Sequence, residues 1–339
     1  MVYTGKDHVA YWMIESDWKL GDPNVDTHQP FNPMETVGVP KPVYTQKQVR
    51  TAESQDHVFS WSEMLALGEG ELTTIYKDPF LLCTAFSHKA VGGWPANTID
   101  ADFTDDDDRD TLAFTYRKYD TAGVSHIDRT IKGIEITKYG WSCEVGDLVR
   151  EKVSVKCADF GTGYAAFSTD ADFDDGHWAN WNEHAELGYH SDQVSISWGG
   201  SGLSTLGLKW KSFDLSLNLE KTQEHTGESK VASLKWPGNR EYTLSVTGRF
   251  TNRTLVEEAE ADEDDKSHSP VRVTLTDDDA NESYIEFTNA IVDNIDKYDI
   301  PPAAEAWEGT IMFKGTRKPA ANFDGAYSEA TDPSARITT

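Results

Sequence analysis

The chain has 339 residues, enough to bury one large all-β core or two modest ones. Its 58 acidic residues against 31 basic ones give a formal charge of −27, which argues against an electrostatic grip on nucleic acid or on anionic membranes. Such acidity is typical of proteins from a high-salt cytoplasm. It is also compatible with a surface kept negative so that nucleic acid passes without sticking. We expect no secretory signal peptide, because the residues after Met1 are mixed and carry charges, and no run approaches the roughly 20 apolar residues of a membrane span.

Residues 1–57 are expected to form an extended N-terminal arm, because prolines recur there among polar residues and interrupt regular structure. Large aromatic side chains such as Trp18 and Phe31 would pin this arm to the body. Further along, Asp78-Pro79 is a helix-start signal. Leu81, Leu82, Ala85 and Phe86 would then share one helix face before Gly92-Gly93 ends the helix.

The segment 131–160 predicts a long β-hairpin that turns at Val145-Gly146-Asp147. Ile134 and Ile136 alternate with Glu135 and Thr137 on the first arm. Val153, Val155 and Cys157 alternate with Lys152, Ser154 and Lys156 on the second arm. Each arm therefore has one apolar and one polar face. A ribbon of this length either packs in a sandwich or pairs with a neighbouring subunit.

Later segments with the same alternation lie around 194–198, 215–219, 242–246, 271–275, 285–287 and 310–313. Six or more such strands predict a mainly β protein with an antiparallel sandwich or barrel and one short packing helix. The β domain would span 58–316, with an irregular insert at 161–190 and a loosely held C-terminal tail at 317–339. The acidic block Glu257–Asp265 is expected to be a solvated loop.

Few residues of the chain form a pattern typical of a metal site or an active site. Asp170, Asp172 and Asp174 have the spacing of the first ligands of a calcium loop, but the glycine and glutamate that complete that motif are missing. No nucleotide-binding or nucleophile motif is present, so we expect neither an enzyme nor a cofactor. The tryptophans are expected to fill the β core or an interface in preference to a sugar-binding face. The three cysteines are expected to be reduced thiols.

The order of these elements resembles the tail tube proteins of long-tailed bacteriophages and of archaeal tailed viruses. The likeness spans most of residues 50–316. It rests on the strand–helix unit ELTTIYKDPFLLCTAF, the hairpin IKGIEITKYGWSCEVGDLVREKVSVKC, and the strands VSISW, KSFDLSLNLEKTQ and REYTLSVTGRF. The insert at 161–190 and the overall length depart from the compact members of that group.

The resemblance implies a structural virion protein that forms rings, typically hexameric, in which hairpins from neighbouring subunits build one barrel around a channel for double-stranded DNA. Its partners would be further copies of itself, the tape measure, terminator and distal tail proteins, and DNA in transit, with no membrane. It would be assembled in the host cytoplasm and reside in the virion tail, and the acidity suggests a halophilic archaeal host. The barrel hairpin would contribute Ile134, Ile136, Tyr139, Trp141, Val149, Val153 and Val155. Residues facing the lumen or rim would be Glu135, Thr137, Lys152, Ser154 and Lys156. Ring-stacking candidates are Trp18, Phe31, Asp105, Asp106, Trp178 and Trp181.

Two other functions compete with this expectation: a carbohydrate-binding β-sandwich that uses the Trp-rich insert, and another virion β-sandwich such as a capsid decoration or distal tail protein. A halophilic hydrolase with a jelly-roll core is a further alternative, although no carboxylate pair stands out.

Overall fold

A computed structural model describes much of the chain. The described residues are 8–14, 29–30, 34–38, 43–49, 59–66, 69–76, 80–85, 98–100, 111–119, 126–157, 159–160, 188–219, 221–224, 234–237, 240–262, 264–276, 282–296, 307–317 and 319–323.

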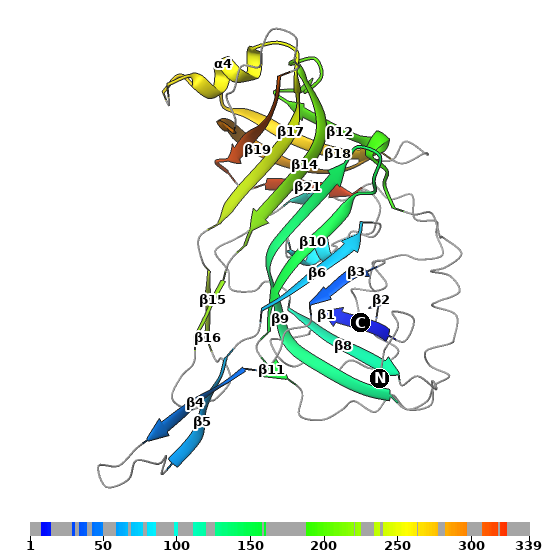
Figure 1. Ribbon diagram of the computed structural model, residues 1–339, viewed down its shortest axis with the longest axis vertical. Coiled ribbons are helices and arrows are strands. Elements are labelled where there is room, and N and C mark those ends of the chain that lie inside the picture. Colours follow the sequence, from blue (N-terminus) through cyan, green and yellow to red (C-terminus); the bar gives the residue numbers. More distant parts are fainter. Residues whose placement is uncertain are drawn as a thin grey trace.

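Strands dominate the fold, and all their pairings are antiparallel, which confirms the mainly β prediction (Figure 1). Within the described part of the chain, seventeen strands belong to one hydrogen-bonded network, which is not a closed barrel, and two further pairs form separate ribbons. The strands are β1 (His8–Ile14), β2 (Gln29–Pro30), β3 (Met34–Gly38), β4 (Val43–Val49), β5 (Phe59–Ala66), β6 (Glu69–Ile75), β7 (Thr98–Asp100), β8 (Leu112–Tyr119), β9 (His126–Glu144), β10 (Arg150–Lys156), β11 (Asp159–Phe160), β12 (Val194–Trp198), β13 (Ser201–Gly202), β14 (Leu208–Asn218), β15 (Lys221–Glu224), β16 (Leu234–Pro237), β17 (Glu241–Phe250), β18 (Ser269–Thr276), β19 (Glu282–Asp296), β20 (Glu308–Gly315) and β21 (Pro319–Phe323).

The predicted hairpin is confirmed and forms the middle of a central sheet. The chain turns at Val145-Gly146-Asp147, and Gly146 has φ of +90°, a conformation that favours glycine. Hydrogen-bonded neighbours follow in the order β3, β6, β10, β9, β14, β17 and β20. The alternating residues of these strands place apolar side chains on one face, which we call the core face. The opposite face, which we call the open face, carries mostly polar side chains.

Strand β9 has 19 residues and belongs to two parts of the network. Its second half pairs with β10 and β14, whereas its first half pairs with β8. The register with β8 shifts between Leu112 and Phe114, next to Gly133, which has φ of +62°. A bulge with a glycine in the left-handed region bends a strand, and this bend lets β9 serve both parts.

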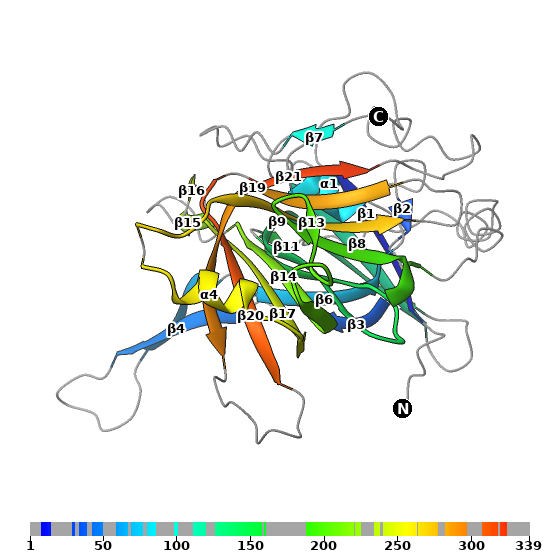
Figure 2. The same ribbon diagram turned by 90° about the horizontal axis from the view of Figure 1, so that it is seen from above.

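A second layer covers the core face. It contains β12, β18, the first half of β19 and β21, which are hydrogen-bonded neighbours in that order. Trp198 of β12 lies 6.2 Å from Phe313 of β20, and Phe287 of β19 lies 6.2 Å from Tyr242 of β17, measured between ring centroids. The two layers are visible from above, with β19 and β21 on one side and β17 and β20 on the other (Figure 2). The core is therefore that of a β-sandwich.

Helix α1 (Phe80–Ala85) confirms that a helix follows Asp78-Pro79, and Leu81, Leu82 and Ala85 are buried. Phe86 and the predicted helix end at Gly92-Gly93 lie outside the described residues. A second helix, α4 (Thr254–Glu260), was missed, because the prediction of a loop over Glu257–Asp265 was wrong for its first part. Leu255 and Val256 are fully or nearly fully buried and anchor α4, so two apolar residues outweigh the acidic run that follows.

The chain ends also contribute strands. Within the expected arm 1–57, β1 pairs with β8 and β3 pairs with β6. The expectation of a loose tail after 317 was wrong for 319–323, because β21 pairs with β19 over five residues. The ribbon β4–β5 extends from the body at the end far from α4, and β15–β16 extends the hairpin that β14 and β17 form (Figure 1).

Candidate assembly surface

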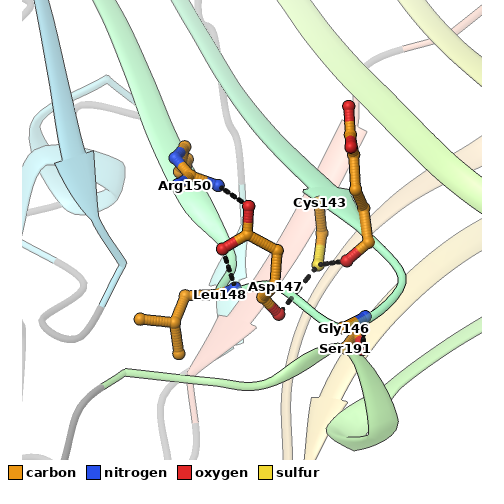
Figure 3. A network of polar contacts seen from close by, with 7 residues as sticks. Cys143, Gly146, Asp147, Leu148, Arg150 and Ser191 are labelled. Atoms are coloured by element: carbon orange, nitrogen blue, oxygen red, sulfur yellow. Dashed lines mark hydrogen bonds and ion pairs between the residues drawn. The ribbon is translucent and has the colours of Figure 1, made fainter.

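A network of short hydrogen bonds fixes the turn of the β9–β10 hairpin (Figure 3). Arg150 Nη1 donates to Asp147 Oδ2 at 2.6 Å, and the backbone N–H of Leu148 donates to Asp147 Oδ1 at 2.8 Å. The N–H of Gly146 donates to Ser191 Oγ at 2.8 Å, and the N–H of Ser191 donates to the Asp147 carbonyl at 3.0 Å. The turn is therefore held both by its own charges and by the segment that follows the insert.

Two side chains at this turn have shifted pKa values. The hydrogen bond from Arg150, followed by that from the Leu148 N–H, lowers the pKa of Asp147 below its ordinary value. Burial, reinforced by the negative charge of Asp147, raises the pKa of the Cys143 thiol to about 11. That thiol points to the carbonyls of Glu144 and Asp147, at 3.3 and 3.6 Å. Cys143 is consequently a neutral thiol at physiological pH, and both Cys143 and Cys157 are free cysteines, as predicted.

A buried carboxylate links the hairpin to its neighbouring strand. Glu151 is fully buried; its Oε2 accepts a hydrogen bond from Thr74 Oγ1 at 2.9 Å and its Oε1 accepts one from Tyr139 at 2.7 Å. Trp141 Nε1 donates to the Tyr139 hydroxyl at 2.8 Å. These four residues come from β6, β10 and β9, so the network sets the mutual register of three strands. Burial, together with the charge of Glu151, raises the pKa of Tyr139 well above its ordinary value.

Aromatic rings pack beside the Glu151 network. Tyr76 lies 4.7 Å from the Trp141 ring and 5.9 Å from the Tyr189 ring, between centroids.

All seven residues predicted to form the barrel hairpin are buried inside the protomer: Ile134, Ile136, Tyr139, Trp141, Val149, Val153 and Val155. Trp198 is also buried and Trp210 packs partly buried against the core, so the described tryptophan side chains fill the core as expected.

Both hydrogen-bonding edges of the hairpin are occupied within the chain. Strand β10 pairs along its whole length with β6, and β9 pairs over Lys138–Glu144 with β14. The hairpin therefore lies inside a sheet and cannot itself add a strand to a neighbouring copy. Among the described pairings of the central sheet, β3 has a partner on one side only.

The expected polar face of the hairpin is only partly exposed. Lys152 is exposed, and Ser154 and Lys156 are half-buried on the open face. Glu135 and Thr137 are buried, at 3% and 7% exposure, which corrects the expectation that both face solvent. Ser154 of β10 is opposite Lys138, but the next residue, Val155, is opposite Ile136. Thr137 therefore has no opposite residue in β10 and lies in a bulge. The alternation of side chains is broken at that point, just before β9 leaves the central sheet.

The open face is polar and nearly balanced in charge, in contrast to the chain as a whole. Ser142, Ser216, Thr243, Ser245 and Thr310 form half-exposed positions across its middle strands. Around them lie the basic residues Lys138, Arg150, Lys152, Lys156, Lys209, Arg249 and Lys314 and the acidic residues Glu69, Glu71, Glu144, Asp214, Glu241 and Glu308.

Ion pairs cross the open face from strand to strand. Lys152 Nζ lies 2.9 Å from Asp214 Oδ2 although β9 runs between their strands. Lys152 is directly opposite Gly140, which offers no side chain to obstruct this path. Lys211 of β14 likewise pairs with Glu308 of β20 across β17, and Lys314 Nζ lies 3.4 Å from Glu241. These pairs are exposed, so each adds little stability, but together they neutralise the basic groups locally.

Several predicted residues lie outside the described residues. These are the ring-stacking candidates Trp18, Phe31, Asp105, Asp106, Trp178 and Trp181 and the calcium candidates Asp170, Asp172 and Asp174. Within the described residues, no group of three or more His, Cys, Asp or Glu side chains could hold a metal ion. In the same part of the chain, no helix has the length and apolar character needed to cross a membrane.

No protein-family model matches the chain, and no curated protein matches it in sequence. The open face and the Glu151 network therefore have to be interpreted from their own geometry. Sequence reasoning missed both. Glu151 looks like one more polar residue before an alternating strand, and only the pairing with β6 and the neighbouring Tyr139 reveal its buried position.

Proposed function

We propose that this protein is a structural virion protein, the subunit of a viral tail tube, and that it assembles into stacked homo-oligomeric rings. The observation that carries the proposal is the open face: in β6, β9, β10, β14, β17 and β20 the side chains of the core face are largely buried, while the open face presents hydroxyls and paired charges. The resemblance in the order of elements is consistent with it. In the ring, we place the open face toward the channel.

A channel wall for DNA has to avoid tight binding to phosphates, because each unpaired lysine or arginine that meets a phosphate adds affinity. On the open face, Lys152 and Lys314 are each paired with a carboxylate. Exposed lysines such as Lys138 are interspersed with exposed carboxylates. Such a wall presents no continuous basic stripe.

Ring closure would use strands other than the hairpin. Among the described pairings, β3 has a partner on one side only and so offers one edge, and the ribbon β4–β5 is a projecting element that can reach a neighbouring copy. Addition of a strand across subunits is a common way to satisfy an exposed edge.

The test is negative-stain electron microscopy of the purified full-length chain in molar salt and in dilute buffer. Rings or tubes with a central channel are the expected result. A protein that stays monomeric at high concentration in both buffers contradicts the proposal. A glycan array run on the same preparation tests the carbohydrate-binding alternative, for which strong selective binding by unassembled protein would be required.

A further inference from the structure

Two like charges lie directly opposite each other on the open face, at the end of the sheet nearest α4 (Figure 1). Lys209 of β14 is paired in register with Arg249 of β17, and both residues are exposed. Like charges in a directly opposed pair destabilise a sheet. The stability of the fold therefore gives no reason for this pair, and a binding role has to be considered.

The carboxylate beside this pair is already engaged by another lysine. Glu308 of β20 is opposite Arg249 on the other side of β17. It forms its ion pair with Lys211, which is the extra residue of the bulge in β14. Within the described part of the chain, neither the Lys209 nor the Arg249 side chain forms a hydrogen bond or an ion pair. We call Lys209 and Arg249 the basic corner.

Hydroxyl groups adjoin the basic corner on the same face. Thr247 lies two residues before Arg249 on β17, which separates the two positions by about 7 Å. Thr247 is opposite Thr310 of β20, with their Oγ1 atoms 2.7 Å apart, and both residues are half-exposed. Proteins contact phosphate oxygens mainly through Lys and Arg, with Ser and Thr hydroxyls beside them. The corner brings both kinds of donor together on one flat surface.

The excess positive charge of the open face is concentrated at this end. Three basic residues, Lys209, Lys211 and Arg249, surround the single carboxylate of Glu308. Elsewhere on the open face, the basic and acidic residues named above are equal in number. Salt screens charges over about 8 Å at physiological ionic strength, so the −27 of the whole chain does not cancel a local contact. It does keep that contact weak.

We propose that the basic corner binds backbone phosphates of double-stranded DNA lying along the open face. Its two cations belong to adjacent strands, with their Cα atoms about 5 Å apart, so both reach the same stretch of backbone. The contact involves phosphates only and is therefore independent of base sequence. If the proposed tail tube is correct, each subunit adds one such contact to the channel; the binding itself does not depend on ring formation.

The test measures binding of the full chain to a short labelled DNA duplex by fluorescence anisotropy over a series of salt concentrations. Lys209→Gln/Arg249→Gln should lower the association constant at least about tenfold at about 0.05 M salt, because it removes two phosphate contacts. The slope of log K against log salt should become shallower by about 2, since fewer counterions are released for each bound protomer.

The matched control, Lys138→Gln/Lys314→Gln, removes two exposed charges from the same face away from the corner. It should lower the association constant by less than about threefold, because charges beyond the screening length contribute little. Lys209→Arg/Arg249→Lys keeps both charges and should bind like the native chain. Circular dichroism confirms the folding of each form. A native chain that does not bind the duplex, equal losses in the corner variant and the control, or an unchanged salt slope would each overturn the proposal.

Electron microscopy of the same samples separates this inference from the tail-tube proposal. Tubes that form normally from Lys209→Gln/Arg249→Gln but bind the duplex more weakly support both. Tubes of that variant that bind the duplex as tightly as native tubes overturn the phosphate contact and leave the tail tube standing. A loss of binding specific to the corner, with no ring in any sample, supports the contact and counts against the tail tube.

Discussion

The Tyr139 hydroxyl lies 2.7 Å from Glu151 Oε1 at a point where both side chains are almost fully buried. Tyr139 is in β9 and Glu151 in β10, and Thr74 of β6 holds the second oxygen of the same carboxylate. A buried carboxylate without partners costs several kcal/mol, whereas one with hydrogen bonds to both oxygens is tolerated. The three strands are therefore coupled, since movement of one would expose an unsatisfied charge.

Thr74→Val should destabilise the fold by about 1.5–3 kcal/mol, because it removes a hydrogen bond to a buried charged group while keeping the side-chain volume. Denaturant unfolding followed by tryptophan fluorescence measures the change. Thr73→Val is the matched control, since Thr73 is half-exposed on the open face of the same strand. The control should change stability by less than about 0.5 kcal/mol. Equal effects at the two positions would contradict the role of the Glu151 network.

The shifted pKa of Cys143 predicts slow alkylation in the native state. The folded pKa is about 11, above the unfolded value of roughly 8.5, so the neutral thiol is the form that folding favours. The corresponding stabilisation is fully present below about pH 8.5 and is lost as the pH rises toward 11. Iodoacetamide labelling at pH 8, mapped by mass spectrometry, should modify Cys143 much faster in denaturant than in buffer. Rapid native labelling of Cys143 would show that the turn opens.

Asp147 predicts the opposite pH dependence at the same turn. Its folded pKa lies below its unfolded value of about 3.9, so its contribution is present above that value and is lost as the pH falls through the folded pKa. Asp147→Asn should therefore lower the melting temperature at neutral pH and lose this difference in strong acid. Asp192→Asn, at an exposed position nearby, is the control. A difference that persists unchanged at low pH would contradict the Arg150 pairing as its cause.

Much of the sandwich could be predicted from side-chain alternation. Val194–Trp198 was predicted to the residue as β12, and the turn at Gly146 was placed correctly, because alternation and a turn glycine are local signals. Helix α4 and strand β21 were missed for a physical reason. The acidic run hides the short anchor Leu255-Val256, and β21 depends on an edge that the distant β19 supplies.

The candidate surface was less predictable than the strands, because it depends on pairing between segments far apart in the chain. Alternation alone predicts that Glu135 and Lys152 are equally exposed. In the structure Glu135 is buried and Lys152 is exposed, and the bulge at Thr137 interrupts the alternation between their positions in the ribbon. The hairpin was expected to pair with neighbouring copies. Its edges are instead occupied by β6 and β14, neither of which is adjacent to it in sequence. A substitution such as Val153→Asp would place a charge in the core of the protomer, so a loss of assembly in that variant would not distinguish misfolding from a broken contact between copies.

Two glycines of the hairpin should respond differently to alanine. A Cβ on Gly140 would lie 2.2 Å from the Leu215 carbonyl oxygen, so the β9–β14 pairing would have to move, at a cost of about 3 kcal/mol. A Cβ on Gly146 would meet nothing within 4 Å, but its φ of +90° is strained for alanine, at a cost of about 1–2 kcal/mol. Thermal unfolding of Gly140→Ala and Gly146→Ala tests this order. A reversed order would contradict the close approach of β9 and β14.

The placement of the open face toward a channel predicts a change in accessibility on assembly. Ser216→Cys puts a thiol in the middle of the open face, opposite Gly140, and Ser195→Cys puts one at an exposed position of β12 in the second layer. A maleimide on a bulky polyethylene glycol should label both thiols in unassembled protein. In assembled tubes it should label Ser195→Cys and spare Ser216→Cys, because the lumen excludes the polymer while the outer layer stays in solvent. Tubes that show the reverse pattern would place the open face on the outside, and the charge-balanced sheet would then need another role.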